Sequence, residues 1–144
     1  MFQNIAVAYD QSSEAERALQ TAIPLATALG SNLHTVTFAE ELPAYTAYGV
    51  AGDPSVLRTL GEDRDKFYGD LQKRAQEMAS AKSVQVVTHL LDGEKVDGII
   101  QFVSEQKIDL LVVGLHHRSL RVSRLWSTVY TLAQEIRCSI LGVH

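Results

Sequence analysis

One stretch near the end of the sequence concentrates groups that could bind an anion. Residues 112–128 read VVGLHHRSLRVSRLWST, with two histidines and three arginines inside nine residues, and no carboxylate occurs between Asp109 and Glu135. Guanidinium groups bind phosphate through paired hydrogen bonds, and a helix N-terminus attracts anions through its free N–H groups. The stretch therefore indicates a site for a small anionic ligand. A solvated basic loop on an acidic protein would explain the arginines equally well.

A second candidate is Asp10, which follows the apolar run NIAVAY at residues 4–9. Its carboxylate could bind a ligand or cap the helix that follows, and the residues alone leave both interpretations open. The sequence contains no GxGxxG, GxxxxGK[ST], HExxH, GxSxG or CxxC pattern. His116 and His117 do not complete a metal site, and Cys138 has no evident histidine partner. The sequence therefore predicts no catalytic residue and no metal ligand.

Composition restricts the class of protein. The chain of 144 residues has a formal net charge of -4, with 46% hydrophobic and 21% charged residues, which predicts one globular domain over residues 1–144. The acidic excess argues against nucleic-acid binding. The single cysteine favours a reducing compartment. We find no signal-like N-terminus and no apolar run long enough for a bilayer, so we expect a cytoplasmic protein without membrane contact.

The elements that position these residues follow from hydrophobic periodicity. Strands are expected at residues 4–9, 33–39, 84–90, 108–113 and 139–143, and helices at 13–29, from Pro54, around 96–103 and from about Ser127. Ser13 and Glu16 have capping-box spacing at the first helix. The alternation predicts an α/β fold, an open parallel five-stranded sheet with helices on both faces. Asp10, the 40–53 connection and the loop after Gly114 should then share the ligand-binding edge.

In this order of elements, NIAVAYDQSSEAERAL near the start and DLLVVGLHHRS, ST and IRCSILGV near the end resemble the universal stress protein family over essentially the whole chain. The resemblance implies a Rossmann-like, adenine nucleotide alpha hydrolase-like fold and a regulatory module of the stress response. It also implies a homodimer paired through residues 139–143. Members that bind nucleotides carry Gly-x2-Gly-x9-Gly-(Ser/Thr) after the fourth strand. Here Gly114, His117, Ser127 and Thr128 occupy these positions, so the spacing is kept and two glycines are replaced.

The resemblance implies that AMP or ATP binds at the carboxyl edge of the sheet. Adenine would lie near Ala8, Asp10 and Phe38. The remaining nucleotide-binding positions would be Val113, Gly114, His117, Arg118, Ser127, Thr128 and Val129.

The two replaced glycines bear on which nucleotide binds. A β-carbon at His117 or Ser127 restricts the close approach of backbone to phosphate, so we expect ATP to bind no tighter than about 100 μM, near -5.5 kcal/mol. A ligand with fewer phosphates, such as AMP, fits better, and at most weak ATP hydrolysis is expected. The alternative is a nucleotide-independent homodimeric interaction module whose basic loop docks an acidic partner.

Overall fold

A five-stranded, all-parallel sheet forms the centre of the molecule. The computed structural model describes residues 1–39, 54–116 and 122–144, without the side chains of Pro54, Leu57 and residues 122–128. The strands are β1 Asn4–Ala8, β2 Asn32–Ala39, β3 Val86–Asp92, β4 Leu110–Gly114 and β5 Ser139–Val143. Their order is β3-β2-β1-β4-β5, and every neighbouring pair is parallel. The predicted α/β sheet is therefore confirmed.

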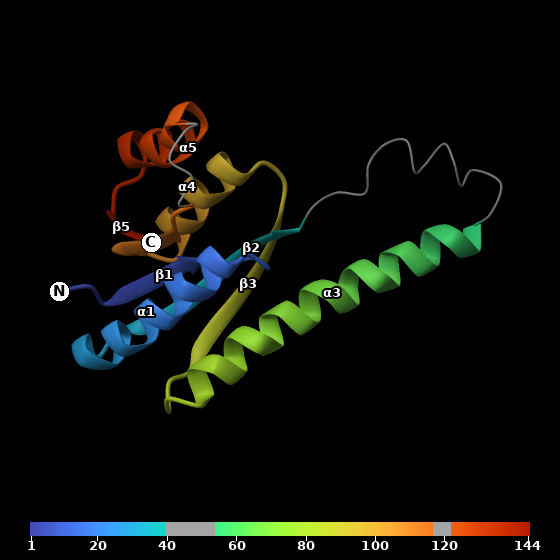
Figure 1. Cartoon of the computed structure of the whole chain (residues 1–144), viewed down its shortest axis with the longest axis horizontal. Helices are drawn as coiled ribbons and strands as arrows, with labels where there is room; N and C mark the ends of the chain where they lie inside the picture. Colours follow the sequence, from blue (N-terminus) through green and yellow to red (C-terminus); the bar gives the residue numbers. More distant parts are fainter. Residues whose placement is uncertain (40–53, 117–121) are drawn as a thin grey trace.

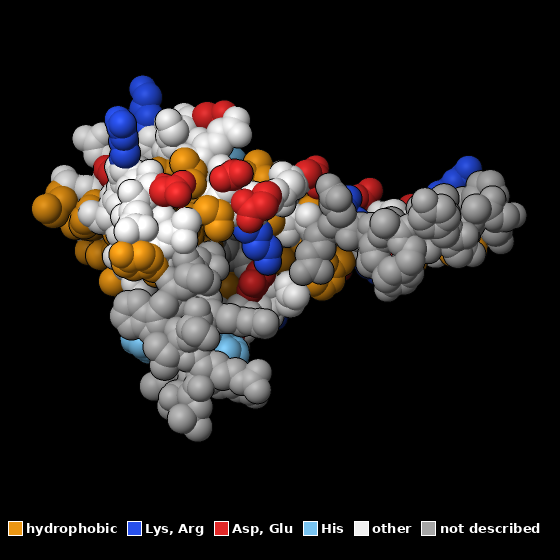
Figure 2. Space-filling model, turned by 90° about the horizontal axis from the view of Figure 1, so that it is seen from above, with side chains coloured by type: hydrophobic (Ala, Val, Ile, Leu, Met, Phe, Trp, Pro, Cys, Tyr) orange, Lys and Arg blue, Asp and Glu red, His pale blue; other side chains and the backbone are white. Residues whose placement is uncertain are grey.

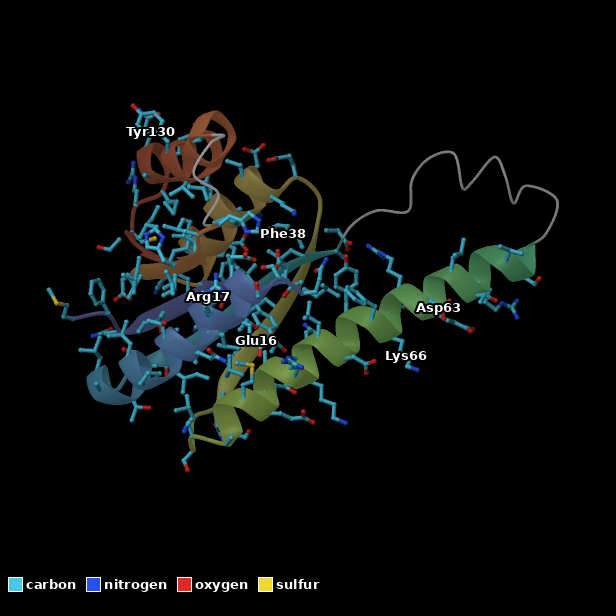
Figure 3. The ribbon with its side chains drawn as sticks, in the orientation of Figure 1. Glu16, Arg17, Phe38, Asp63, Lys66 and Tyr130 are labelled. Carbon is cyan, nitrogen blue, oxygen red and sulfur yellow. The ribbon has the colours of Figure 1, made fainter. Side chains whose placement is uncertain are left out.

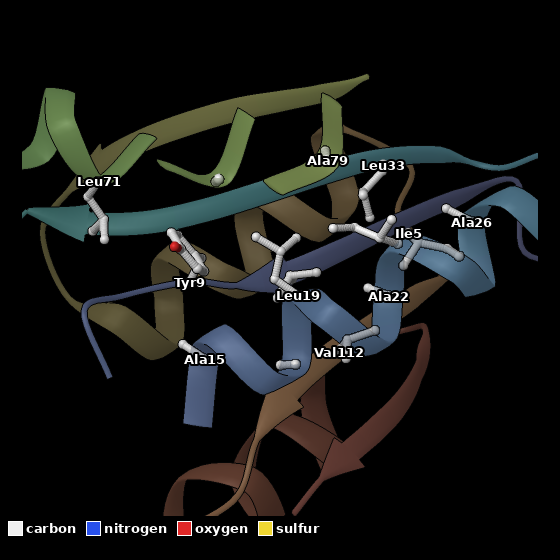
Figure 4. Packing of buried hydrophobic residues seen from close by; sticks show 14 of the residues in the cluster. Ile5, Tyr9, Ala15, Leu19, Ala22, Ala26, Leu33, Leu71, Ala79 and Val112 are labelled. Atoms are coloured by element: carbon white, nitrogen blue, oxygen red, sulfur yellow. The ribbon is translucent and has the colours of Figure 1, made fainter. Parts of the chain in front are cut away.

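Helices cover both faces of this sheet (Figure 1). They are α1 Ser13–Leu29, α3 Pro54–Ser80, α4 Lys95–Glu105 and α5 Val122–Glu135. Alternate residues of each strand point to opposite faces, and two apolar clusters result. One joins Ile5, Val7, Leu33 and Val112 to the buried side chains of α1 and α3, as Figure 4 shows in part. The other joins Ala6, Val36 and Leu111 to α4 and α5.

The first helix begins one residue earlier than its capping-box spacing suggested. Ser12, with extended backbone, is the N-cap, and its Oγ accepts a hydrogen bond of 3.1 Å from the N–H of Ala15. The expected cap, Ser13, is the first helical residue instead. The buried face of α1 consists largely of alanines, Ala15, Ala18, Ala22 and Ala26, together with Leu19 and Ile23. Small side chains let the helix lie close to β1 and β4.

Among the side chains of α3 that the structure describes, the buried ones lie in its second half, which packs on the sheet. Its buried side chains are Tyr68, Leu71, Ala75 and Ala79, whereas Val56 and Phe67 are 38% and 46% exposed. The first half extends past the sheet (Figure 1), and Figure 2 shows some of its charged side chains on the part that projects from the body. The ion pair between Arg74 Nη2 and Glu16 Oε1, 2.7 Å, joins the packed half of α3 to α1.

The last helix begins at Val122, so the expectation of a start at about Ser127 is wrong. No glycine or proline interrupts residues 122–127, and Leu125, Val129, Leu132 and Ile136 continue one apolar stripe at helical spacing. Ser127 and Thr128 therefore lie in the second turn of α5 rather than at its N-terminus. Across residues 1–39, 54–116 and 122–144, no helix combines the length and apolarity needed to cross a bilayer.

Candidate functional site

The ends of β1 and β4 meet where the strand order reverses. From β1 the sheet runs through β2 and β3 in one direction and through β4 and β5 in the other. Val7 is paired with Val112, so the carboxyl ends of the two strands lie side by side. Asp10 follows β1 and Gly114 ends β4, so these two predicted site residues share one edge, as expected. Ligands of open parallel sheets bind at such an edge.

Asp10 is exposed at this edge and shapes the turn into α1. Its Oδ1 accepts a hydrogen bond of 2.8 Å from the N–H of Ser12, the residue that caps the helix. The capping interpretation of Asp10 therefore has a structural basis. The same bond fixes the orientation of the carboxylate at the edge, which is also what a ligand-binding acid requires.

Four further predicted site residues gather beneath the edge on one face of the sheet. Ala8, Phe38, Val113 and Val129 all belong to the apolar cluster covered by α4 and α5. Phe38 points from β2 towards this side (Figure 3), and its ring lies over Gly98 of α4. A β-carbon on Gly98 would stand 2.3 Å from Cε1 of that ring. The Phe38 ring can therefore occupy this position because Gly98 has no side chain.

Gly114 contacts α1 on the opposite face. A β-carbon at Gly114 would lie 2.4 Å from both the carbonyl carbon and the carbonyl oxygen of Glu14. Real β-carbons do not approach backbone atoms so closely, so this position must be glycine for β4 to end against the first turn of α1. The resemblance assigned Gly114 to nucleotide binding, and the structure adds a packing requirement at the same residue.

The side chains of Glu14 and His116 are in close contact, which the sequence did not reveal. Glu14 Oε1 lies 2.6 Å from His116 Nδ1, and Arg17 Nη2 lies 3.9 Å from the same oxygen. The Glu14 backbone N–H lowers the pKa of the Glu14 carboxyl most, and the His116 imidazole lowers it further. The pair ties the first turn of α1 to the segment that leaves β4. Its partners are far apart in the sequence, so no local spacing could have identified it.

A second charged cluster lies between α1 and α3, on the other side of the first turn. Arg74 interacts with Glu16 and with the hydroxyl of Tyr9, and burial is the main cause of the raised pKa of Tyr9. Figure 3 shows Glu16 on the side of α1 that faces α3. Two acids of one helical turn thus have different environments: Glu16 faces α3, and Glu14 faces the candidate edge.

The remaining predicted site residues either lie outside the described residues or are described by their backbone alone. His117 and Arg118 lie outside the described residues, as do Arg121 and the 40–53 connection. For Ser127 and Thr128 the backbone is described, within α5, but not the side chains. The sequence argument that placed them at an anion-binding helix N-terminus no longer holds, and their contact with nucleotide stays a prediction.

Other titratable side chains are buried or partly buried. His34 Nδ1 of β2 lies 3.1 Å from His89 Nε2 of β3, and the His89 ring packs edge-on against Phe102. Burial lowers the pKa of both imidazoles, which favours their neutral forms. Burial also raises the pKa of the Cys138 thiol, so that thiol is not activated as a nucleophile. Among the described residues, no group of three or more His, Cys, Asp or Glu could hold a metal ion.

Comparison with known proteins gives a consistent result. The model of the universal stress protein family matches residues 1–144. A Thermus aquaticus protein described as a universal stress protein in the QAH/OAS sulfhydrylase 3′ region is 32% identical over 114 residues, covering 79% of this chain and 77% of that protein.

Solved structures agree in fold. Universal stress protein UspA from Lactobacillus plantarum is 20% identical with a TM-score of 0.75, covering 99% of this chain and 98% of its own. A universal stress protein solved in complex with cAMP is 23% identical with a TM-score of 0.69, covering 99% and 97%.

Proposed function

The chain belongs to the universal stress protein family, and from this premise we propose that it is a regulatory module that binds an adenine nucleotide, AMP or ATP, at the carboxyl edge of β1 and β4. The base would lie against Ala8 and Phe38, and Asp10 would accept hydrogen bonds from the nucleoside. The phosphate end would lie towards Gly114 and the segment that follows it. No catalytic residue is assigned.

The observation that carries this proposal is the meeting of Asp10 and Gly114 where the strand order reverses. The edge combines the groups that a nucleotide needs. Asp10 offers an oriented carboxylate, and Phe38 offers an aromatic ring above an apolar layer that includes Ala8 and Val113. Apolar side chains beside a few placed polar groups are typical of small-molecule sites.

The ligands of related proteins support the choice of an adenine nucleotide. Three solved universal stress proteins, with TM-scores of 0.69, 0.69 and 0.67 to this chain, are described as bound to cAMP, AMP and dAMP. Each of these three ligands contains adenine and a single phosphate. Their common ligand chemistry makes AMP the first ligand to test.

Titration calorimetry with AMP on the wild type and on Asp10→Asn tests the proposal. The amide keeps an oxygen for the Ser12 N–H but loses the charge, so we expect AMP affinity to fall about tenfold, as for loss of a hydrogen bond to a charged group. Asp92→Asn is the matched control, because Asp92 ends β3 and pairs with Arg64 at 3.0 Å. It should leave AMP binding unchanged. Failure of the wild type to bind AMP, ADP or ATP at millimolar concentration would reject the proposal.

One observation also favours pairing between two copies of the chain. Within the part of the chain that the structure describes, β4 is the only strand neighbour of β5, which forms one edge of the sheet. Its residues Ile140, Leu141 and Val143 are only partly buried. An edge strand of this kind can pair with another chain. We therefore also propose a homodimer joined through Ser139–Val143, which is compatible with nucleotide binding at the carboxyl edge and would remain if no nucleotide bound.

A further inference from the structure

We propose that Thr37 is a positioning residue of the nucleotide site: its hydroxyl holds the peptide group that leads into Asp10 and so sets the direction of the Asp10 carboxylate. The inference rests on the proposed function, because Asp10 is the acid to which that function assigns the nucleoside. Thr37 itself is 2% exposed, so its side chain lies inside the protein. Neither the sequence motifs nor the family resemblance pointed to this residue.

The Thr37 hydroxyl continues the connection between β1 and β2 past the end of β1. The two strands are paired up to Ala8 and Val36. One residue later, the N–H of Tyr9 still donates to Val36 O at 2.9 Å, and Tyr9 O accepts from Thr37 Oγ1 at 2.8 Å. The second bond is buried, so water does not compete for the carbonyl oxygen. Both backbone polar groups of Tyr9 are therefore held by β2.

The planarity of the peptide bond transmits this restraint to Asp10. The carbonyl of Tyr9 and the N–H and Cα of Asp10 belong to one planar group. A bond to the carbonyl oxygen therefore restricts the rotation of the whole group, and with it the direction in which the Asp10 side chain leaves the backbone. The bond from the Ser12 N–H to Asp10 Oδ1 also restrains the carboxylate, but it is exposed to solvent. The buried bond is the firmer restraint, because hydrogen bonds are stronger where the dielectric is low.

The side chain of Tyr9 leaves this peptide little other freedom. It is 3% exposed, belongs to the apolar cluster under α1 and α3 (Figure 4), and its hydroxyl interacts with Arg74. Tyr9 cannot turn as a whole without leaving that cluster. The remaining motion is rotation of the peptide between Tyr9 and Asp10 about its flanking bonds, and this is the motion that the Thr37 hydroxyl opposes.

Thr35 supplies a matched control on the same strand. It lies two residues before Thr37, so both side chains point to the same face of the sheet, and it is 1% exposed. Within the part of the chain that the structure describes, its hydroxyl has no hydrogen-bond partner. Valine at either position keeps the branched shape of threonine and removes the hydroxyl. The change releases a bond to the Tyr9 carbonyl at Thr37, but not at Thr35.

The experiment measures the dissociation constant of AMP for the wild type, Thr37→Val, Thr37→Ser and Thr35→Val. We expect Thr37→Val to weaken AMP binding about fivefold, as when a binding-competent orientation is populated about one fifth of the time. Thr37→Ser keeps the donor and should stay within about twofold of the wild type. Thr35→Val should bind AMP as the wild type does. All titrations are made well below the lowest melting temperature of the four proteins.

Thermal melting of the same proteins separates positioning from stability. Thr37→Ser loses a buried methyl group, so its melting temperature should fall although its affinity for AMP is kept. Thr37→Val should lose affinity while it is still fully folded. Affinities that followed the melting temperatures, with Thr37→Ser as weak as Thr37→Val, would overturn the inference.

A second comparison determines whether Thr37 acts through Asp10. In Asp10→Asn the charge that Thr37 would direct is absent, so adding Thr37→Val should weaken AMP binding by about twofold or less instead of fivefold. A full fivefold loss in this background would show that Thr37 acts by another route, such as the adjacent Phe38, and would overturn the inference.

The outcomes distinguish this inference from the proposal on which it rests. If the wild type binds AMP and Thr37→Val binds it equally well, the positioning role is rejected and the nucleotide site stands. Equal weakening by Thr35→Val would also reject the role, because the effect would then belong to the strand and not to one bond. If the wild type binds no adenine nucleotide, both proposals fall together. Should Thr37→Val not fold, Thr37→Cys, whose thiol is a weak donor, replaces it, and wild-type affinity in that protein overturns the inference.

Discussion

At the scale of single residues, three glycines meet different surroundings. A β-carbon on Gly114 would meet backbone atoms of Glu14, and one on Gly98 would meet the ring of Phe38. A β-carbon on Gly61, in the exposed first half of α3, would meet nothing within 4 Å. Backbone atoms that are packed against a sheet shift less readily than a side-chain ring does. The three positions should therefore respond differently to the same added methyl group.

We predict that Gly114→Ala lowers the free energy of unfolding by about 1–3 kcal/mol, the usual cost of overpacking. Gly98→Ala should cost less, because the Phe38 ring can move. Gly61→Ala should raise the free energy of unfolding by about 0.5–1 kcal/mol, since alanine is the better helix former. Urea unfolding of the three variants measures the differences. A Gly114→Ala protein as stable as the wild type would show that β4 and α1 are not held so closely.

The sequence located part of the candidate site at this scale. Asp10 and Gly114 could be placed at one edge because carboxyl ends of parallel strands meet there, whereas Ala8, Phe38 and Val113 were implied as site residues only by the family resemblance. The contact between Glu14 and His116 could not be predicted. It depends on how closely α1 lies against β4, which is a property of packing and leaves no periodic signal.

At the scale of elements, sequence periodicity gave the order of strands and helices but misplaced two strand starts. Strands expected from Val84 and Ile108 begin at Val86 and Leu110. The N–H groups of Val84 and Ile108 instead bond to Ala79 and Val103, five residues back, and so close the ends of α3 and α4. This is the Schellman arrangement, in which an apolar residue follows a left-handed one and folds back on the helix. An apolar residue in that place is easily mistaken for the start of a strand.

The left-handed residues at these two helix ends are not glycines. Ser83 and Lys107 have φ of 58° and 53°, whereas Gly30 occupies the same position after α1 with φ of 65°. A β-carbon is unfavourable in this conformation by about 1 kcal/mol or more. Both residues are exposed, so their side chains contribute little packing.

We predict that Ser83→Gly and Lys107→Gly each raise the free energy of unfolding by about 0.5–1 kcal/mol, because the strain of the left-handed backbone exceeds the added freedom of the unfolded chain. Gln106→Gly is the control. Its residue has φ of -87°, so glycine there gains nothing and should lower stability. Denaturant titration at constant pH compares the three. Destabilisation by Lys107→Gly as large as that by Gln106→Gly would contradict the argument.

At the scale of the whole molecule, the direction of backbone groups on β5 decides how two copies could pair. The N–H of Ser139 donates to Asp109 O at 3.1 Å, and Val143 O accepts from the N–H of Leu115 at 2.7 Å. In a parallel ladder alternate residues turn their N–H and C=O groups to opposite sides. Ser139, Leu141 and Val143 therefore face β4, and Ile140 and Gly142 face away from the sheet, where a partner strand would bind.

Ile140→Pro should therefore split the proposed dimer, because proline removes an outward donor while an edge strand tolerates it. Ile140→Ala loses the same side chain from the α4 and α5 cluster but keeps the N–H, so it should remain dimeric. Leu141→Pro should instead destabilise the monomer itself, since its N–H faces β4. Light scattering at micromolar concentration gives the mass of each protein, and circular dichroism reports folding. A monomeric wild type would reject the proposed dimer. A dimer that survives Ile140→Pro would place the interface elsewhere than β5, because a pair joined through this edge needs that backbone donor.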